Sequence, residues 1–270
     1  MRGALIAASA LLALCAPAQA DETRIAASWD EGLAEAQRRN VPIVVILQKD
    51  GAQPFVNLLQ QPALAQPLGD RAVVIVGHRP GGHEPARRVD RRERREVEYC
   101  PLYLTIECRS HDEVYNTYAG RFDYEELPAA FVCRPDGRAV VSGVERLAPP
   151  AIMEKVNETQ VALGEGVFRS EVERLERKLL KGDEKLADGK QGPARKIFEG
   201  ELEDARKPLL RAACEQRLEQ LDARALELIE EARAREGKPR SDALHRIERE
   251  MRGRAPGERA AEVLRELEAS

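Results

Sequence analysis

Two short, continuous apolar runs in the first third of the chain each follow a segment in which apolar residues recur at helical spacing. A helix is predicted over residues 28–40, and the apolar run 43–47 comes shortly after it. A second helix is predicted over 54–68, broken near Pro62, and it leads to the apolar run 72–76. Continuous runs of branched apolar residues predict strands that are buried on both faces. The pattern therefore predicts a βαβ unit with a right-handed crossover.

The pattern up to residue 163 completes one α/β domain. It predicts a short helix over residues 111–118 and a strand over 129–133. A turn over 134–137, a returning strand over 138–141 and a final helix over 151–163 follow. The turn contains an Asp-Gly pair, which is a strong hairpin indicator between two strands. These elements extend the predicted sheet by a hairpin and add helices to its faces.

The pattern changes at Phe168, because charged residues dominate from there and the apolar residues keep helical spacing. Segments that contain glycine and proline interrupt this spacing, which predicts about five helices of roughly 10 to 25 residues each. Narrow apolar stripes are typical of helical hairpins or a loose bundle. We therefore predict an α/β domain over residues 21–165 and an α-helical region over 166–270.

Residues 1–20 have the organisation of a secretory signal peptide. Arg2 forms the positive segment, residues 4–14 form the apolar segment, and Ala18-Gln19-Ala20 provides a small-x-small cleavage pattern. The apolar segment is shorter than the ~20 residues that span a bilayer. Cys15 leaves a lipoprotein signal open, although the bulky leucine before it argues against lipidation. The prediction is a periplasmic or secreted protein with no transmembrane segment after cleavage.

Composition narrows the range of partners. The chain has 43 basic and 47 acidic residues and a net charge of −4, and signal cleavage removes one further positive charge. A mildly acidic chain is unsuited to nucleic acid as its main partner. Charged residues make up 33% of the chain and aromatic residues only 4%, which indicates extensive solvated helix surface. We therefore expect a protein or peptide partner.

The arginine-rich run over residues 87–98 leaves two interpretations open. It contains six arginines with acidic residues interleaved among them. Clustered arginines can bind an anionic surface or a phosphate. Acidic residues at helical distances from the arginines instead favour ion pairs along a solvated helix. The second interpretation, a solvated helix, is the prediction.

The order of elements over residues 24–163 resembles the thioredoxin fold. Its most specific parts are the helix that begins at Trp29-Asp30, the Val41-Pro42 pair before the first strand, and Leu127-Pro128 before the hairpin. These features are similar to exported thioredoxin-like proteins. The resemblance implies that Leu127-Pro128 is a cis peptide and that an extended peptide binds in a groove beside it. The predicted fold class is thus a thioredoxin-like α/β domain, with a mixed central sheet flanked by helices, followed by an all-α helical-hairpin region.

The redox motif of that family is missing at its usual place. Thioredoxin-like oxidoreductases carry Cys-x-x-Cys after the first central strand, where a helix N-terminus lowers the thiolate pKa. Here residues 48–55 read Gln-Lys-Asp-Gly-Ala-Gln-Pro-Phe and contain no cysteine. Ordinary dithiol chemistry at that position is therefore excluded.

Four cysteines remain after signal cleavage, at positions 100, 108, 133 and 214. In an oxidising compartment Cys100 and Cys108 are predicted to form a disulfide, while Cys133 and Cys214 are predicted core residues. The Cys108-Arg109-Ser110-His111 segment has the spacing of a metal pair. With Cys100 and Cys133 it leaves a zinc site of three thiolates and one imidazole open. The pair Cys100/Cys108, supported by Arg109 and His111, is the alternative redox site.

Two further histidines, His78 and His83, follow the second predicted strand. Both could approach a ligand at the carboxyl ends of the strands, but they flank Pro80-Gly81-Gly82, which favours a solvated loop. His245 lies apart from them in the helical region. The sequence contains no nucleophile elbow and no glycine-rich phosphate loop.

These observations predict an exported, redox-inactive thioredoxin-like module that binds or scaffolds a protein partner and has a helical interaction tail. No cofactor is expected, and enzymatic activity is not the prediction. Two alternatives stay open: a thiol-disulfide oxidoreductase that uses Cys100 and Cys108, and a metal-binding protein that uses Cys100, Cys108, His111 and Cys133 with zinc.

Overall fold

The computed structural model describes residues 25–26, 28–49, 61–80, 83–90, 95–101, 108–121, 127–138 and 149–269. Contacts divide the chain into two compact units, residues 1–169 and 170–270, and each is described by itself. The division lies close to the predicted boundary at residues 165 and 166. The predicted signal peptide with Cys15, and most of the stretch that replaces the redox motif, lie outside the described residues.

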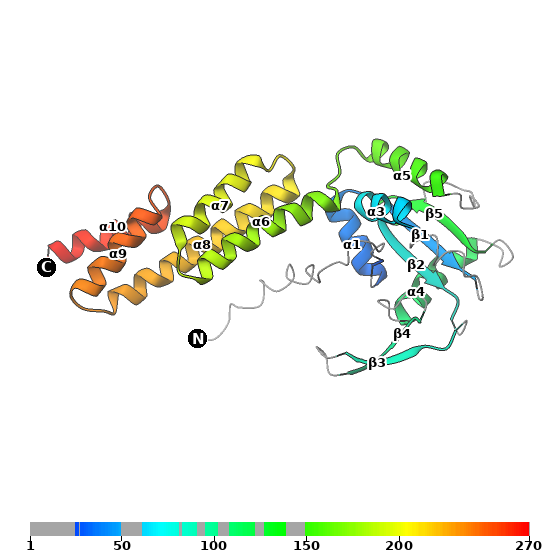
Figure 1. Ribbon diagram of the computed structural model, residues 1–270, viewed down its shortest axis with the longest axis horizontal. Coiled ribbons are helices and arrows are strands. Elements are labelled where there is room, and N and C mark those ends of the chain that lie inside the picture. The colour runs from blue at the N-terminus through cyan, green and yellow to red at the C-terminus, as the bar shows by residue number, and fades with distance from the viewer. Residues whose placement is uncertain are drawn as a thin grey trace. The chain divides into compact units, whose positions relative to one another are not determined.

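The N-terminal unit is built on a mixed sheet of three strands in the order β2-β1-β5 (Figure 1). The strands are β1 (Ile43–Gln48), β2 (Val73–His78) and β5 (Ala129–Cys133). Strand β1 pairs in parallel with β2 and antiparallel with β5. All residues of the three strands are buried, as their continuous apolar runs require. Three of the four strands predicted in this unit are confirmed, over residues 43–47, 72–76 and 129–133.

Helices cover both faces of this sheet. They are α1 (Trp29–Arg39), α3 (Pro62–Arg71), α4 (Cys108–Tyr118) and α5 (Pro149–Leu163). Successive residues of a strand point to opposite faces. Val45 of β1 accordingly packs in one apolar cluster with α1 and α4, whereas Ile46 packs in another with α3 and α5. The unit therefore has a helix–sheet–helix architecture.

Local sequence explains where α1 begins and ends. The Ser28 hydroxyl accepts a hydrogen bond of 3.1 Å from the amide of Glu31, which is an N-cap. Asn40 ends the helix in the left-handed region with φ 51°, a conformation that asparagine tolerates better than most residues. Both ends of the predicted helix are confirmed.

Arg39, in the last turn of α1, holds the end of that helix against two other segments. Its side chain is only 3% exposed, and it pairs with Glu35 at 2.9 Å. It also donates hydrogen bonds to the carbonyls of Asp70, at the end of α3, and Val167, after α5. Burial lowers the pKa of Arg39, and the Glu35 carboxylate opposes this shift. These partners make Arg39 a structural residue.

The remaining predictions for this unit are mostly confirmed. Helix α3 begins at Pro62, where the predicted helix 54–68 was expected to break, and residues 54–60 of that prediction lie outside the described residues. Helix α4 begins three residues before its predicted start, and α5 begins two residues before its own. The Leu127-Pro128 peptide is cis. The turn closes with a bond of 2.9 Å from the Gly137 amide to the Arg134 carbonyl, and Gly137 has φ 79°. The returning strand lies outside the described residues beyond Arg138.

The solvated helix predicted over residues 87–98 is wrong. The segment contains two antiparallel strands, β3 (Ala86–Asp90) and β4 (Arg95–Tyr99), in which Arg87 pairs with Glu98. The side chains of Arg87 and Glu98 form an exposed ion pair of 3.3 Å across the ladder. The apolar residues of β4 recur with a period of two, which is the period of a strand. The spacing of the charged residues was compatible with a helix and with a hairpin, because oppositely charged side chains can form ion pairs along a helix or across two paired strands.

The C-terminal unit contains five helices over residues 170–269, as predicted. They are α6 (Arg169–Ala187), α7 (Gln191–Asp204), α8 (Pro208–Arg233), α9 (Lys238–Glu250) and α10 (Ala255–Glu268). Helix α7 packs on α8, and α9 packs on α10 and α8. Consecutive helices thus pack as hairpins, and their apolar stripes supply the buried residues of this unit.

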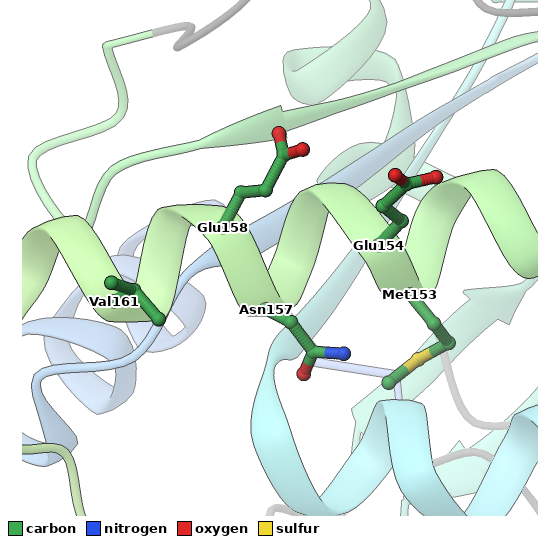
Figure 2. A pocket seen from close by; sticks show the side chains of 5 residues that line it. All are labelled: Met153, Glu154, Asn157, Glu158 and Val161. Atoms are coloured by element: carbon green, nitrogen blue, oxygen red, sulfur yellow. The ribbon is translucent and has the colours of Figure 1, made fainter.

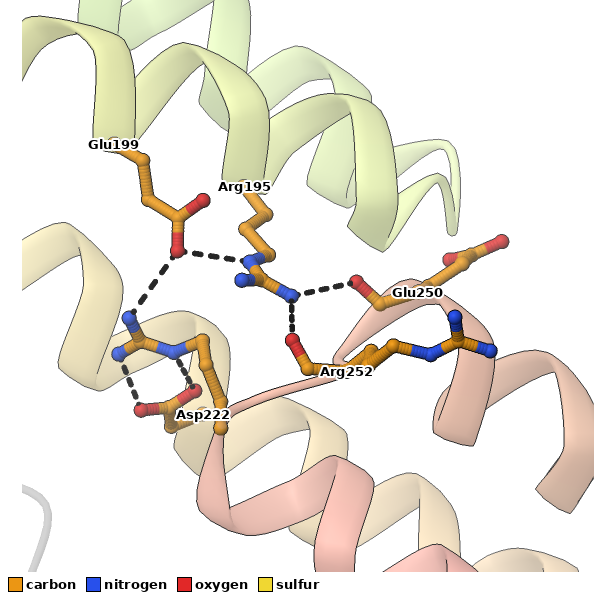
Figure 3. A network of polar contacts seen from close by, with 6 residues as sticks. Arg195, Glu199, Asp222, Glu250 and Arg252 are labelled. Atoms are coloured by element: carbon orange, nitrogen blue, oxygen red, sulfur yellow. Dashed lines mark hydrogen bonds and ion pairs between the residues drawn. The ribbon is translucent and has the colours of Figure 1, made fainter.

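A polar network joins three of these helices (Figure 3). Arg195 of α7 pairs with Glu199 at 2.8 Å and donates to the carbonyls of Glu250 and Arg252 at the end of α9. Arg254, which precedes α10, binds both carboxylate oxygens of Asp222 in α8 at 2.7 and 2.5 Å. A bidentate pair of this kind fixes orientation as well as distance. The network therefore sets how the α9–α10 turn meets α7 and α8.

Candidate metal centre

Three histidines and one cysteine meet where β2 ends and α4 begins. His78 is the last residue of β2, and His83 lies five residues further along the chain. Cys108 and His111 lie in the first turn of α4. Their spacing of three residues places both side chains on one face of that helix. The site is therefore assembled from one strand end, the segment after it, and one helix start.

Gly77 allows α4 to approach β2 closely. A Cβ atom on Gly77 would lie 2.8 Å from the backbone nitrogen of Tyr115 and 2.9 Å from a methyl carbon of Leu47. The first of these contacts is with backbone, which cannot rotate away. The absence of a side chain at this position thus positions α4 directly against β2, immediately before His78.

The potential ligand atoms of His83, Cys108 and His111 all lie within 4.8 Å of one another. The Nε2 atom of His83 is 3.4 Å from the Sγ atom of Cys108, and the rings of His83 and His111 have centroids 5.0 Å apart. Nitrogen and sulfur ligands of tetrahedral zinc are about 3.4–3.6 Å apart, given their bond lengths to the metal. The spacing therefore fits a shared ion after small side-chain adjustments.

His111 is buried without a satisfied ring nitrogen. It is 1% exposed, and neither Nδ1 nor Nε2 makes a hydrogen bond of normal geometry, although a backbone group of His78 lies close enough to act on its pKa. The Oδ1 atom of Asp112 is 3.0 Å from Nδ1 but not in hydrogen-bond geometry. Burial, with His83 and His78 nearby, lowers the pKa of His111 to about 3. His111 is thus neutral at neutral pH, which is the form of imidazole that binds a metal.

Cys108 has a thiol environment unlike that of a redox cysteine. The pKa of Cys108 is raised to about 11, chiefly by burial and to a smaller extent by the neighbouring Cys100 and Asp112. A nucleophilic cysteine requires the opposite shift. Cys100 is fully buried, and all four cysteines are thiols rather than disulfide-bonded in the described chain. This environment does not favour the Cys100/Cys108 redox site, and the predicted disulfide between these two residues is not formed in the described structure.

The structure brings together only part of the predicted metal set. Cys108 and His111 belong to the three-residue group, but Cys100 and Cys133 do not. Cys100 packs in the apolar cluster of α3 and α5, whereas Cys133 packs in the cluster on the opposite face of the sheet. The sheet therefore separates Cys133 from Cys100.

Sequence reasoning assigned His78 and His83 to a solvated loop, and for His78 this is wrong. His78 is 1% exposed, and His83 is half-buried with its ring 4.7 Å from that of His78. The sequence did contain the signal for the alternative interpretation, because both histidines follow the carboxyl end of a predicted parallel strand, but the Pro80-Gly81-Gly82 turn was given more weight. That position is where α/β folds collect ligand-binding groups.

The predicted peptide groove rests on Leu127 and Pro128. Leu127 is 6% exposed and packs in the apolar cluster with α1 and α4, while Pro128 is half-buried. Leu127 therefore contributes to the core, and a groove beside Pro128 stays a prediction.

A shallow depression of about 710 Å³ lies along α5 and is lined by Met153, Glu154, Asn157, Glu158 and Val161 (Figure 2). Two of its three polar side chains have partners: Asn157 accepts a hydrogen bond from Arg71, and Glu158 pairs with Lys155. Glu154 and Glu158 point away from Met153 and Asn157. The depression therefore lacks the convergent polar groups that define a ligand site.

Comparison with known proteins gives no relative, since no family model matches the chain and no curated protein matches its sequence. Among the helices of the described residues, none has both the length and the apolar character that a membrane span requires. The class of protein is therefore defined by its own fold and site: a helix-rich α/β protein with a convergent group of nitrogen and sulfur ligands.

Proposed function

We propose that this chain is a metal-binding protein whose N-terminal unit holds one transition-metal ion through His83, Cys108 and His111. The observation that carries the proposal is the convergence of three ligand atoms within 4.8 Å around a buried imidazole whose ring nitrogens make no hydrogen bond of normal geometry. An unsatisfied polar group in a core is costly and calls for a physical reason. A bound metal ion supplies that reason.

The ligand types restrict the metal. Two imidazoles and one thiolate form a borderline-soft set, which suits zinc or copper and is unsuited to magnesium or calcium. The cation also stabilises the thiolate of Cys108, whose pKa is otherwise raised. One bound ion would therefore account both for the buried imidazole of His111 and for the thiol of Cys108 in a site where its thiolate is otherwise disfavoured.

We also propose that the unit is thioredoxin-like and that the protein is exported. The sheet order β2-β1-β5, with Ile25 bridging to Val74 on the far edge of β2 and helices on both faces, supports the first proposal. The signal-peptide pattern of residues 1–20 supports the second. Metal binding takes precedence over the scaffolding and oxidoreductase functions because it has a geometric basis in the described residues.

Metal analysis of the purified mature chain tests the function. We expect one zinc or copper ion per chain, and substitution with Co(II) is expected to give a thiolate charge-transfer band. Cys108→Ser should abolish that band, and His83→Gln and His111→Gln should weaken metal binding by more than about 100-fold.

Two variants serve as matched controls for this experiment. Cys133→Ala removes a cysteine of the predicted set that lies outside the group, and His245→Gln removes an exposed histidine of the C-terminal unit. Both should bind metal as the wild type does. A wild-type chain that folds but binds neither zinc, copper nor cobalt stoichiometrically would contradict the proposal.

A further inference from the structure

The two ring nitrogens of His83 face different partners. Its Nε2 atom lies 3.4 Å from the Sγ atom of Cys108, on the side of the proposed metal. Its Nδ1 atom lies 3.3 Å from the Nδ1 atom of His78. A histidine that ligates a metal through one nitrogen normally donates the N–H of the other to a fixed acceptor.

We infer that His78 is the positioning residue of this site: it accepts the Nδ1–H of His83 and so holds the ring of His83 with Nε2 toward the metal. The inference rests on the proposed function. With the metal on Nε2, a neutral His83 carries its proton on Nδ1, and the facing Nδ1 of His78 accepts it. His78 then carries its own proton on Nε2.

The surroundings of His78 make it suitable for this task. It is the terminal residue of a fully buried strand and is 1% exposed, so its ring has little freedom to turn. The rings of His78 and His83 lie edge to face, with planes 78° apart. A rigid acceptor on the strand thus orients a ligand that lies on a less buried segment.

The structure also indicates which hydrogen bond changes when the metal binds. The Nδ1 atom of His78 is 3.1 Å from the carbonyl oxygen of Arg79, to which it donates when it carries the proton. It cannot donate there and accept from His83 at the same time. Metal binding therefore moves the proton of His78 from Nδ1 to Nε2 and exchanges the bond to Arg79 for the bond from His83.

Three substitutions at His78 separate this acceptor role from packing. His78→Asn places Oδ1 near the position of Nδ1 and keeps an acceptor there. His78→Gln places its acceptor near the position of Nε2 instead, and His78→Leu provides none. The matched control is His245→Asn, at an exposed histidine of the C-terminal unit.

The experiment is a Zn²⁺ titration of the full mature chain against a chelator of known affinity, with Co²⁺ spectra of the same proteins. We expect His78→Leu and His78→Gln to weaken Zn²⁺ binding by about 10- to 100-fold, while His78→Asn stays within about threefold of wild type. Every variant should still bind one Co²⁺ at saturation with an unchanged charge-transfer band, because the ligands themselves are intact.

Each other outcome has a definite meaning. If all three variants bind as tightly as wild type, His78 is not a positioning residue, although the metal site stands. If His78→Asn is as weak as His78→Leu, packing rather than an acceptor at Nδ1 is responsible. If the Co²⁺ spectrum changes, His78 is itself a ligand. If the wild-type protein binds no metal, both the proposed function and this inference are wrong.

Discussion

Burial is the largest cause of the pKa shifts of the buried cysteine Cys214 and the buried histidine His111. Cys214 is fully buried in α8, and its pKa is raised to about 11, mainly by burial and partly by Glu201 and Glu215. The same cause lowers the pKa of His111. In both cases the apolar surroundings favour the neutral form of the group.

The raised pKa of Cys214 predicts how its reactivity depends on pH. The folded protein keeps the thiol proton between pH 9 and about 11, whereas the unfolded chain loses it near 9, the ordinary value. The stability that this proton contributes is therefore fully present below pH 9 and is lost as the pH rises through 11. We expect alkylation of native Cys214 by iodoacetamide, followed by mass spectrometry, to stay slow up to pH 10.

The denatured chain is the control for this measurement, and there labelling of Cys214 should accelerate as the pH passes 9. If native Cys214 labels as fast as the denatured thiol at pH 9, the side chain is accessible and the assigned burial is wrong.

At the scale of elements, two glycines set how closely neighbours pack. Gly77 allows α4 to approach β2, and Gly182 of α6 accommodates the ring of Phe198 from α7. A Cβ atom on Gly182 would lie 2.2 Å from that ring, which is fully buried and cannot move aside. In both places the helix can pack this closely because the glycine carries a hydrogen atom where any other residue would carry a Cβ atom.

Substitution of Gly77 should affect both folding and metal binding. Gly77→Ala forces the new methyl group against the backbone of Tyr115, and we expect a loss of about 1–3 kcal/mol in the free energy of unfolding. Metal affinity should fall as well, because Cys108 and His111 move with α4. Denaturant titration and Zn²⁺ competition measure the two effects. Gly120→Ala is the control, since no atom lies within 4 Å of its Cβ position.

The C-terminal unit offers a matched pair of helical glycines. Gly182→Ala should destabilise the protein by about 1–3 kcal/mol, because overpacking outweighs the gain in helix propensity. Gly200→Ala in α7, with no atom within 4 Å of its Cβ position, should instead stabilise it by up to about 1 kcal/mol. Urea unfolding followed by circular dichroism gives both values. Effects of the same sign would contradict the close packing of α6 on Phe198.

At the scale of the whole molecule, the chain consists of two units with separate cores. Each buries its own apolar residues, and the proposed metal ligands belong to the first unit alone. A ligand that binds only the folded form stabilises the unit that contains its site. The effect of metal should therefore be confined to the first unit.

Hydrogen exchange tests this expectation. Zn²⁺ at about 100 times its dissociation constant should stabilise the first unit by about 2.7 kcal/mol. Amide exchange in β1, β2 and α4 should slow accordingly, while exchange in α7–α10 stays unchanged. His111→Gln should show no slowing at the same Zn²⁺ concentration. Equal slowing in both units would indicate that they unfold together.

The outcome at particular elements shows which patterns are informative. The runs 43–47 and 129–133 predicted strands correctly, because a strand covered on both faces is apolar at every position. The segment 87–98 was assigned to a helix because ion pairs form at similar distances along a helix and across a hairpin. Charge spacing alone does not distinguish these two structures.

The sequence by itself determined the buried strands, the caps of α1, the helical C-terminal region and one candidate pair of metal ligands, Cys108 and His111. Each of these depends on residues that are neighbours along the chain. Only the tertiary structure decided that His83 joins that pair, that His78 lies beside it, and that Cys133 does not belong to it. The reason is physical: the approach of α4 to β2 depends on Gly77, and no local pattern encodes a contact between residues so far apart in sequence.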